Sequence, residues 1–190
     1  IDGIILGYGT LKKISYHILT LGTAQKYWMR YKTWDEGCSV QDKFFKVLKR
    51  YHPDAREATI EEQYQHIDFV TRIGTIDVKG KKRANRRMGV SSDIQWIEFK
   101  SNCGLPGWIY GTQDYIAFER DYGFILVGTA DLRKLAESLC NLTERVYKST
   151  DALYKAYQRM DRCDLLSMIK VKDILTLPYK ILQYDINELI

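Results

Sequence analysis

Two aspartates and a lysine lie close together in this sequence, in a pattern suited to metal-assisted hydrolysis. Asp68 stands nine residues before Asp77, and Lys79 follows within the stretch TIDVKGKKR. Two neighbouring carboxylates repel each other, and a divalent cation such as Mg²⁺ removes that penalty, because proteins commonly hold Mg²⁺ with one or two carboxylates plus water and phosphate oxygens. A lysine on the same side can hold a water beside a phosphate. Together these residues suggest attack of water on a phosphodiester.

A dense run of cations follows directly. Residues 79–87 read KGKKRANRR, with six cations in nine residues. Such a run can neutralise backbone phosphates, which supply much of the affinity of proteins for nucleic acids. We therefore expect DNA as the partner, with phosphate contacts from Lys81, Lys82, Arg83, Arg86 and Arg87. The alternatives are a solvated hairpin tip and a loop that docks an acidic protein.

Alternating apolar residues predict strands at 65–71, 74–80 and 93–101. Gly74 fits a tight turn between the first two strands. Because strand side chains alternate, Asp77 and Lys79 should share one face of the sheet, while Ile76 and Val78 face the core. Asp68 should project from the same face of the adjacent strand.

Further elements complete a mixed α/β pattern. Phe44, Val47, Leu48 and Tyr51 recur at helical spacing, after Ser39 as the expected cap. Strands are expected at 114–119, 123–128 and 165–171. A helix is expected over 130–147 with Thr129 as its cap, then a polar helical stretch to about Met160 and a short element at 172–177.

We expect an N-terminal extension over 1–38 and an α/β domain over 39–190, with a mixed central sheet flanked by helices and with C-terminal helical and strand additions.

The arrangement of Asp68, Asp77-Val78-Lys79 and the surrounding elements resembles the PD-(D/E)xK nuclease superfamily over roughly residues 39–136. The resemblance implies a restriction-endonuclease-like core and a Mg²⁺- or Mn²⁺-dependent endonuclease. Asp68, Asp77 and the carbonyl of Val78 would bind the metal, and Lys79 would orient the attacking water. It also points to phage, mobile-element or Holliday-junction-resolvase relatives. A homodimer and a cytoplasmic location, the host cytoplasm for a phage protein, are expected by analogy.

Three features depart from the family pattern. Ile67 stands where a proline often precedes the first aspartate. Gln41 occupies the place of a glutamate that many members carry on the first helix, which suggests weaker or single-ion metal binding. Glu98-Phe99-Lys100 also satisfies the motif with Asp77, at a longer spacing. We prefer Asp77-Val78-Lys79 because the hairpin is compact and the basic run follows it. The alternative function is a non-catalytic nucleic-acid-binding or assembly module on the same fold.

Composition bears on the partner, on a zinc site and on a membrane span. The net charge of +5 favours an anionic partner only weakly. No CxxC pair occurs among the four cysteines, so we expect free thiols in a reducing compartment rather than a structural zinc site. No apolar run approaches the length of a membrane span. Trp108 is expected in the core, although Trp108 and Tyr110 are also the best candidates for contacting DNA. Gln113 is a candidate polar residue near the site.

Overall fold

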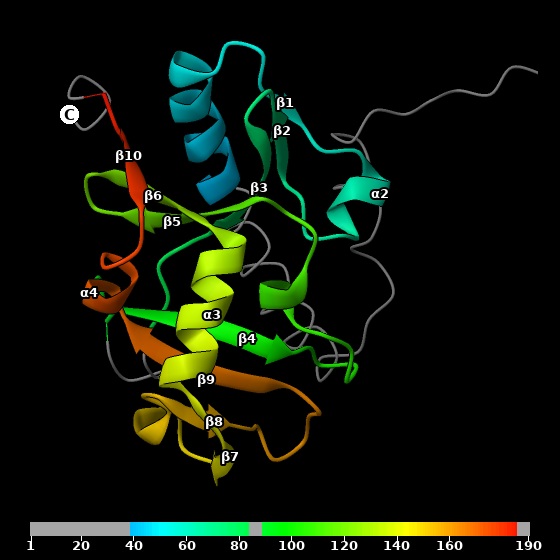
Figure 1. The fold of residues 1–190 in the computed structure, drawn as a ribbon, viewed down its shortest axis with the longest axis vertical. Coiled ribbons are helices and arrows are strands. Elements are labelled where there is room, and N and C mark those ends of the chain that lie inside the picture. Colours follow the sequence, from blue (N-terminus) through cyan, green and yellow to red (C-terminus); the bar gives the residue numbers. More distant parts are fainter. Residues whose placement is uncertain (1–38, 84–88, 186–190) are drawn as a thin grey trace, which may run out of the picture. The chain divides into compact units, whose positions relative to one another are not determined.

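The computed structural model of the chain describes residues 39–83 and 89–185. Two β-sheets and several helices make up this part of the chain, which confirms the expected α/β class (Figure 1). The predicted N-terminal extension, residues 1–38, lies outside the described residues. Among the residues described, every helix is too short or too polar to cross a membrane.

The larger sheet contains the predicted hairpin. Its strands are β1 (Arg56–Glu57), β2 (Phe69–Thr71), β3 (Gly74–Lys79), β5 (Tyr115–Arg120), β6 (Gly123–Gly128) and β10 (Tyr179–Gln183), in the order β1-β2-β3-β5-β6-β10. β2 and β3 are antiparallel, with Phe69 opposite Ile76. β3 and β5 are parallel, with Asp77 opposite Ile116. Gly74 has φ +137°, and a Cβ there would lie 2.6 Å from the Asp114 carboxylate, so the turn requires glycine.

A helix over residues 39–51 covers one face of this sheet (Figure 1). Ser39, the expected cap, is already helical. Phe44 is fully buried, and its ring lies 5.5 Å from the Phe69 ring and 4.8 Å from the Phe124 ring. Tyr51, expected on the same apolar face, is half exposed. The aromatic contacts fix this helix against β2 and β6.

The smaller sheet contains β4 (Ile94–Lys100), β9 (Leu165–Lys170), β8 (Lys155–Tyr157) and β7 (Asn141–Val146), in the order β4-β9-β8-β7. The predicted strand at 93–101 is thus confirmed as a strand, but our expectation that it neighbours the hairpin in one central sheet is wrong. β4 pairs with β9, and the strand beside β3 is β5. The domain therefore has two sheets where we expected one.

The predicted helix after Thr129 is correct only in its first part. α3 runs over Thr129–Leu139, so Thr129 is its first residue and not its cap. The side chain of Asn141 accepts hydrogen bonds from the backbone N–H groups of Thr143 and Glu144, at 3.1 and 3.2 Å. Because these bonds compete with helical ones, the chain leaves the helix and continues as β7. The expected helical stretch to about Met160 is also wrong: it holds only the one-turn η3 (Ser149–Asp151), between β7 and β8.

A second core lies between the larger sheet and the elements on its other face. It joins Ile116 and Phe118 of β5 to Leu132 of α3, and also includes Ile97 of β4 and Ile169 of β9. η2 (Trp108–Tyr110) contributes Trp108 and Ile109 to the same core. α4 (Val171–Ile174) occupies the start of the short element expected at 172–177, and β10 was not predicted. Both faces of the larger sheet are therefore covered.

Candidate active site

Asp77 and Lys79 point from β3 toward the second core. Ile76 and Val78 pack against the helix of residues 39–51, so their neighbours on the strand point the opposite way. The two side chains do share a face, as predicted. That face is covered, however, and Asp77 is only 2% exposed. Lys79 Nζ lies 2.7 Å from both carboxylate oxygens of Asp77 and donates a hydrogen bond to Oδ1.

Asp68 lies directly before β2 and reaches across to β3. Its Oδ2 accepts a 2.7 Å hydrogen bond from the backbone N–H of Val78. Its Oδ1 accepts a 2.7 Å hydrogen bond from Nε2 of Gln41, on the helix of residues 39–51. The structure therefore brings Gln41, the residue that stands in the expected place of a glutamate, into contact with the carboxylate pair.

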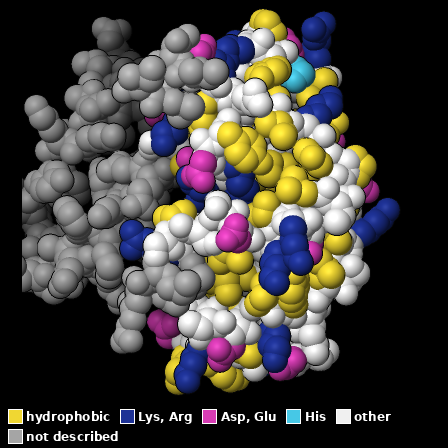
Figure 2. Space-filling view, turned by 90° about the vertical axis from the view of Figure 1, so that its left-hand side faces the viewer, with side chains coloured by type: hydrophobic (Ala, Val, Ile, Leu, Met, Phe, Trp, Pro, Cys, Tyr) yellow, Lys and Arg dark blue, Asp and Glu magenta, His cyan; other side chains and the backbone are white. Residues whose placement is uncertain are grey.

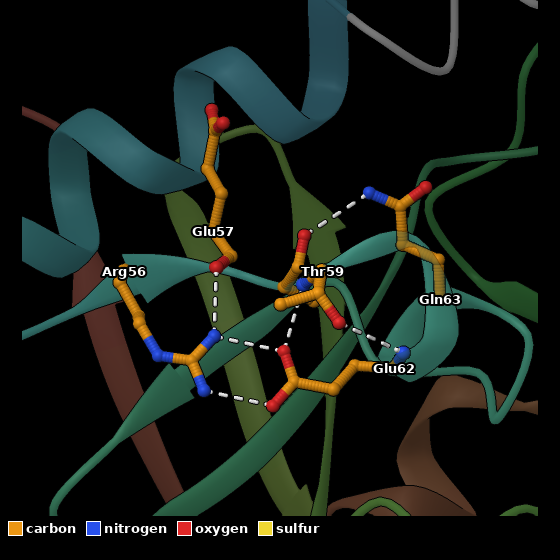
Figure 3. Close-up of polar contacts among 6 residues, drawn as sticks. Arg56, Glu57, Thr59, Glu62 and Gln63 are labelled. Carbon is orange, nitrogen blue, oxygen red and sulfur yellow. Dashed lines mark hydrogen bonds and ion pairs between the residues drawn. The ribbon is translucent and has the colours of Figure 1, made fainter.

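A capped turn before β2 holds the backbone of Asp68. α2 (Ile60–Gln63) begins with a capping box: Thr59 Oγ1 accepts a bond from the N–H of Glu62, whose carboxylate accepts one from the N–H of Thr59 (Figure 3). Arg56 also binds this carboxylate through both terminal nitrogens, at 2.7 and 2.8 Å, and lowers the pKa of Glu62 to about 2 (Figure 3). The N–H of Ala58 then donates to the carbonyl of Asp68 at 2.9 Å. These local contacts place Asp68 beside β3.

Burial dominates the electrostatics of the carboxylate pair. It raises the pKa of Asp77 to about 7, and the negative charge of Asp68 adds to this effect while Lys79 opposes it. Among the described residues, no hydrogen bond reaches Oδ2 of Asp77, although Lys79 Nζ is close to it. A buried carboxylate oxygen without a hydrogen bond is costly unless a cation satisfies it. In this structure the Lys79 ammonium, 2.7 Å from Oδ2, is the cation that compensates the buried carboxylate.

The residues present fit one divalent ion of the Mg²⁺ type. The donors are hard oxygens from Asp68 and Asp77, the ligand class that Mg²⁺ prefers. No group of three or more His, Cys, Asp or Glu side chains suited to a metal occurs in the described part of the chain. Gln41, a neutral amide, takes the place where a third carboxylate would add charge. The predicted role of the Val78 carbonyl stays a prediction.

Trp108 is a neighbour of the site that sequence reasoning assigned to the core or to DNA contact. It is 7% exposed, and Lys79 Nζ lies 5.1 Å from the centroid of its ring, in a cation–π contact. The Nε2 group of Gln113, which is buried, donates a 2.7 Å hydrogen bond to the carbonyl of Trp108. The sequence feature that could have indicated this placement of Trp108 is Gly107. A Cβ there would lie 2.1 Å from the carbonyl oxygen of Glu98, so glycine lets the chain before Trp108 pass close to β4. Trp108 therefore packs its buried ring against the Lys79 ammonium.

Tyr110, the other candidate for DNA contact, is held by α3. Its hydroxyl donates to Glu137 at 3.0 Å, and the Arg133 guanidinium lies 5.4 Å from its ring. His66, with φ +63°, is influenced by the charges of the site: burial and the cation of Lys79 lower its pKa, while Asp68 opposes them. Because its pKa is lowered, His66 is expected to be a neutral polar neighbour of the two carboxylates.

Glu98 approaches the site from the other sheet. Burial raises its pKa, while the charge of Lys79 and a hydrogen bond from the Trp108 backbone oppose the rise. Lys100 is exposed at the end of β4, where its side chain lies near Gly104. The compact group is Asp68, Asp77 and Lys79, with Glu98 at its edge.

The predicted phosphate-contacting run begins where β3 ends. Lys81 forms an ion pair with Asp121, and its backbone N–H donates to Glu119 at 3.2 Å. Lys82 and Arg83 are exposed, and the Arg83 carbonyl accepts a 3.0 Å hydrogen bond from the Trp96 indole. Arg86 and Arg87 lie outside the described residues. Figure 2 shows Lys and Arg side chains interspersed with Asp and Glu on the described part of one face, so the excess positive charge is not concentrated there.

Comparison of the chain with protein-family models, curated proteins and solved structures finds no match. The functional interpretation therefore rests on the geometry of the site and on the resemblance of its motif.

Proposed function

We propose that this chain is a metal-dependent endonuclease that hydrolyses DNA phosphodiester bonds on a restriction-endonuclease-like core. The observation that carries the proposal is the group of Asp68, Asp77 and Lys79, which joins two carboxylates and an amine at the β2–β3 hairpin. A buried carboxylate whose pKa is strongly raised beside a specific charge partner is typical of functional sites.

Each residue has a role in this proposal. A bound Mg²⁺ or Mn²⁺ supplies charge neutralisation at the phosphate and lowers the pKa of a bound water. Asp68 and Asp77 would hold the ion, and Gln41 orients Asp68 through the 2.7 Å bond to Oδ1. Lys79 exchanges its contact with Asp77 for the attacking water or a phosphate oxygen. Trp108 helps to position the ammonium through the cation–π contact at 5.1 Å.

The test is cleavage of supercoiled plasmid, linear duplex and a four-way junction with Mg²⁺, Mn²⁺ or EDTA. We expect metal-dependent cutting by the wild type and none by Asp77→Asn, which keeps the shape of the side chain. Asp151→Asn is the matched control, because it removes an exposed carboxylate on η3, away from the residues proposed to contact DNA. Equal cutting by wild type and Asp77→Asn, with both variants folded, contradicts the assignment.

A non-catalytic nucleic-acid-binding module is the second candidate. Gln41 favours it, because a neutral amide leaves the site with one negative charge fewer than the glutamate pattern provides. This candidate predicts salt-dependent DNA retention without turnover. Asp77→Asn would then leave binding unchanged or tighten it. Removal of Lys82 and Arg83 should reduce the slope of log affinity against log salt by about two in either case.

The biological setting follows from the proposed activity. Cutting both strands of a duplex favours a homodimer, which light scattering of the purified chain tests directly. A DNA nuclease of this type is expected in the cytoplasm, or in the host cytoplasm if the protein is encoded by a phage.

A further inference from the structure

Two exposed thiols lie beyond the same end of the smaller sheet. β4 and β9 are antiparallel neighbours, and Lys100 near the end of β4 pairs with Leu165 at the start of β9. Cys103 follows Lys100 by three residues, and Cys163 precedes Leu165 by two. Both cysteines are exposed free thiols. The strand register therefore brings the two turns that carry them to one edge of the domain.

The chain on each side of Cys103 contacts the turn that carries Cys163. On one side, Asn102 Oδ1 accepts hydrogen bonds from Arg159 at 2.9 Å and from Arg162 at 3.5 Å. On the other side, a Cβ built on Gly104 lies 3.8 Å from the Cβ of Cys163. Disulfides join Cβ atoms that are about 3.5–4.5 Å apart. The two sequence neighbours of Cys103, Asn102 and Gly104, thus both lie close to the turn that carries Cys163.

The turn itself has room for a small adjustment. The N–H of Gly104 donates to the carbonyl of Ser101 at 2.9 Å, so Asn102 and Cys103 form the centre of a tight turn. Gly104 has φ +80°, a conformation that glycine adopts easily. Cys103 is the residue next to Gly104, about 3.8 Å away from Cα to Cα, so a rearrangement confined to this turn and pivoting at Gly104 is what the disulfide requires.

We propose that Cys103 and Cys163 form an intramolecular disulfide when the chain meets a thiol-directed oxidant such as glutathione disulfide. Cys140 differs, because it is 6% exposed and burial raises the pKa of its thiol. Thiolates are the reacting form, so this buried cysteine is a poor competitor. The cations Lys100 and Arg162 beside the pair favour approach of an anionic oxidant. The proposal is independent of the nuclease activity.

The reaction balances with one equivalent of oxidant. One protein thiolate attacks a sulfur of glutathione disulfide, forms a mixed disulfide and releases one glutathione thiolate. The second protein thiolate then attacks the protein-bound sulfur of the mixed disulfide and releases the other glutathione. Two protein thiols are oxidised to one disulfide, glutathione disulfide is reduced to two glutathiones, and the two protons pass to these products.

The test is oxidation of the full chain with glutathione disulfide, followed by trypsin digestion without reductant and mass spectrometry. We expect a linked pair of peptides, residues 101–120 and 163–170, that separates when reductant is added. Cys103→Ser and Cys163→Ser should each abolish the linked pair, while Cys140→Ser and Cys38→Ser should leave it. The oxidised wild type should also melt at a higher temperature than Cys103→Ser treated in the same way, because a cross-link restricts the unfolded chain.

Two outcomes overturn the proposal. The first is glutathione on each cysteine separately, with no linked pair of peptides at any ratio of oxidant to protein. The second is a link that joins Cys103 or Cys163 to Cys38 or Cys140. Neither outcome bears on DNA cleavage, so failure here is distinguishable from failure of the proposed function.

Discussion

The chain carries two carboxylate-x-lysine triplets on strands, and their surroundings differ. Asp77-Val78-Lys79 lies on β3, inside a sheet that is covered on both faces, whereas Glu98-Phe99-Lys100 lies on β4, the first strand of the other sheet. Asp77 is buried and ion-paired with Lys79, while Lys100 is exposed. The same sequence pattern thus occurs in two different environments. The reason is that burial, and the presence of a second carboxylate beside the triplet, depend on tertiary structure.

Asp68 is what separates the two triplets chemically. It bonds the backbone N–H of Val78 and raises the pKa of Asp77. Glu98 has its own carboxylate neighbour in Asp164, but the side chain of Asp164 is bound by Arg159. The first pair is held by the Lys79 ammonium and the second by the Arg159 guanidinium, and we expect only the first to exchange this partner for a metal ion. The following predictions test this difference.

The largest expected effect is on the rate of DNA cleavage. Asp77→Asn should lower the initial rate by about 10³-fold or more, because it removes a charge from the centre of the site. Glu98→Gln should lower it by about 10- to 100-fold at most. Rates on supercoiled plasmid at saturating Mg²⁺ provide the measurement. Equal losses in the two variants would remove the distinction between the triplets.

The two lysines should differ in the same direction. Lys79→Met keeps the length of the side chain and should reduce the rate by about 10²-fold, as expected for loss of a group that positions water. Lys100→Met should change the rate little, because its ammonium lies near Gly104, away from the carboxylate pair. Single-turnover rates separate this effect from DNA binding. A larger loss in Lys100→Met would favour the Glu98 triplet.

The stability of the folded chain should depend on pH through Asp77. Its folded pKa of about 7 exceeds the ordinary value of 3.8. The folded state therefore holds this proton more tightly, and the contribution is present below about pH 4 and lost as pH rises through 7. Between these limits the free energy of unfolding should fall by a few kcal/mol.

Urea unfolding at pH 5 and pH 8 without metal provides this measurement. Asp77→Asn should reduce the fall in the free energy of unfolding between pH 5 and pH 8, and Asp121→Asn on the β5–β6 turn should not. A wild type whose stability rises from pH 5 to pH 8, or an unchanged slope in Asp77→Asn, would contradict the burial of this carboxylate.

Gln41 should have a smaller effect than Asp77. Gln41→Ala removes the bond to Asp68 and should weaken metal binding by about 10- to 100-fold, as expected for loss of a partner that orients a ligand. Gln41→Glu should tighten it by adding charge. Asp42→Ala, an exposed neighbour on the same helix, is the control. A null effect of both Gln41 variants would leave Gln41 without a role in the site.

The hairpin and several strands could be predicted because their signals are local. Phe69 and Ile76 alternate with polar residues, and Gly74 marks the turn between them. The separation of β4 into a second sheet could not be predicted, because its partner β9 is distant in the sequence. The same non-local packing buries Asp77, which alternation alone placed on an open face. The end of α3 depends on a side-chain contact of Asn141 that periodicity does not reveal.

Metal binding by the wild type and two variants is the sharpest test of whether the active site lies on β3. Titration with Mn²⁺, followed by the electron paramagnetic resonance signal of the free ion, gives stoichiometry and affinity without any need for turnover. The account predicts one ion per chain, lost in Asp77→Asn and retained in Glu98→Gln. Unchanged binding in Asp77→Asn, or binding lost only in Glu98→Gln, would contradict the placement of the active site on β3.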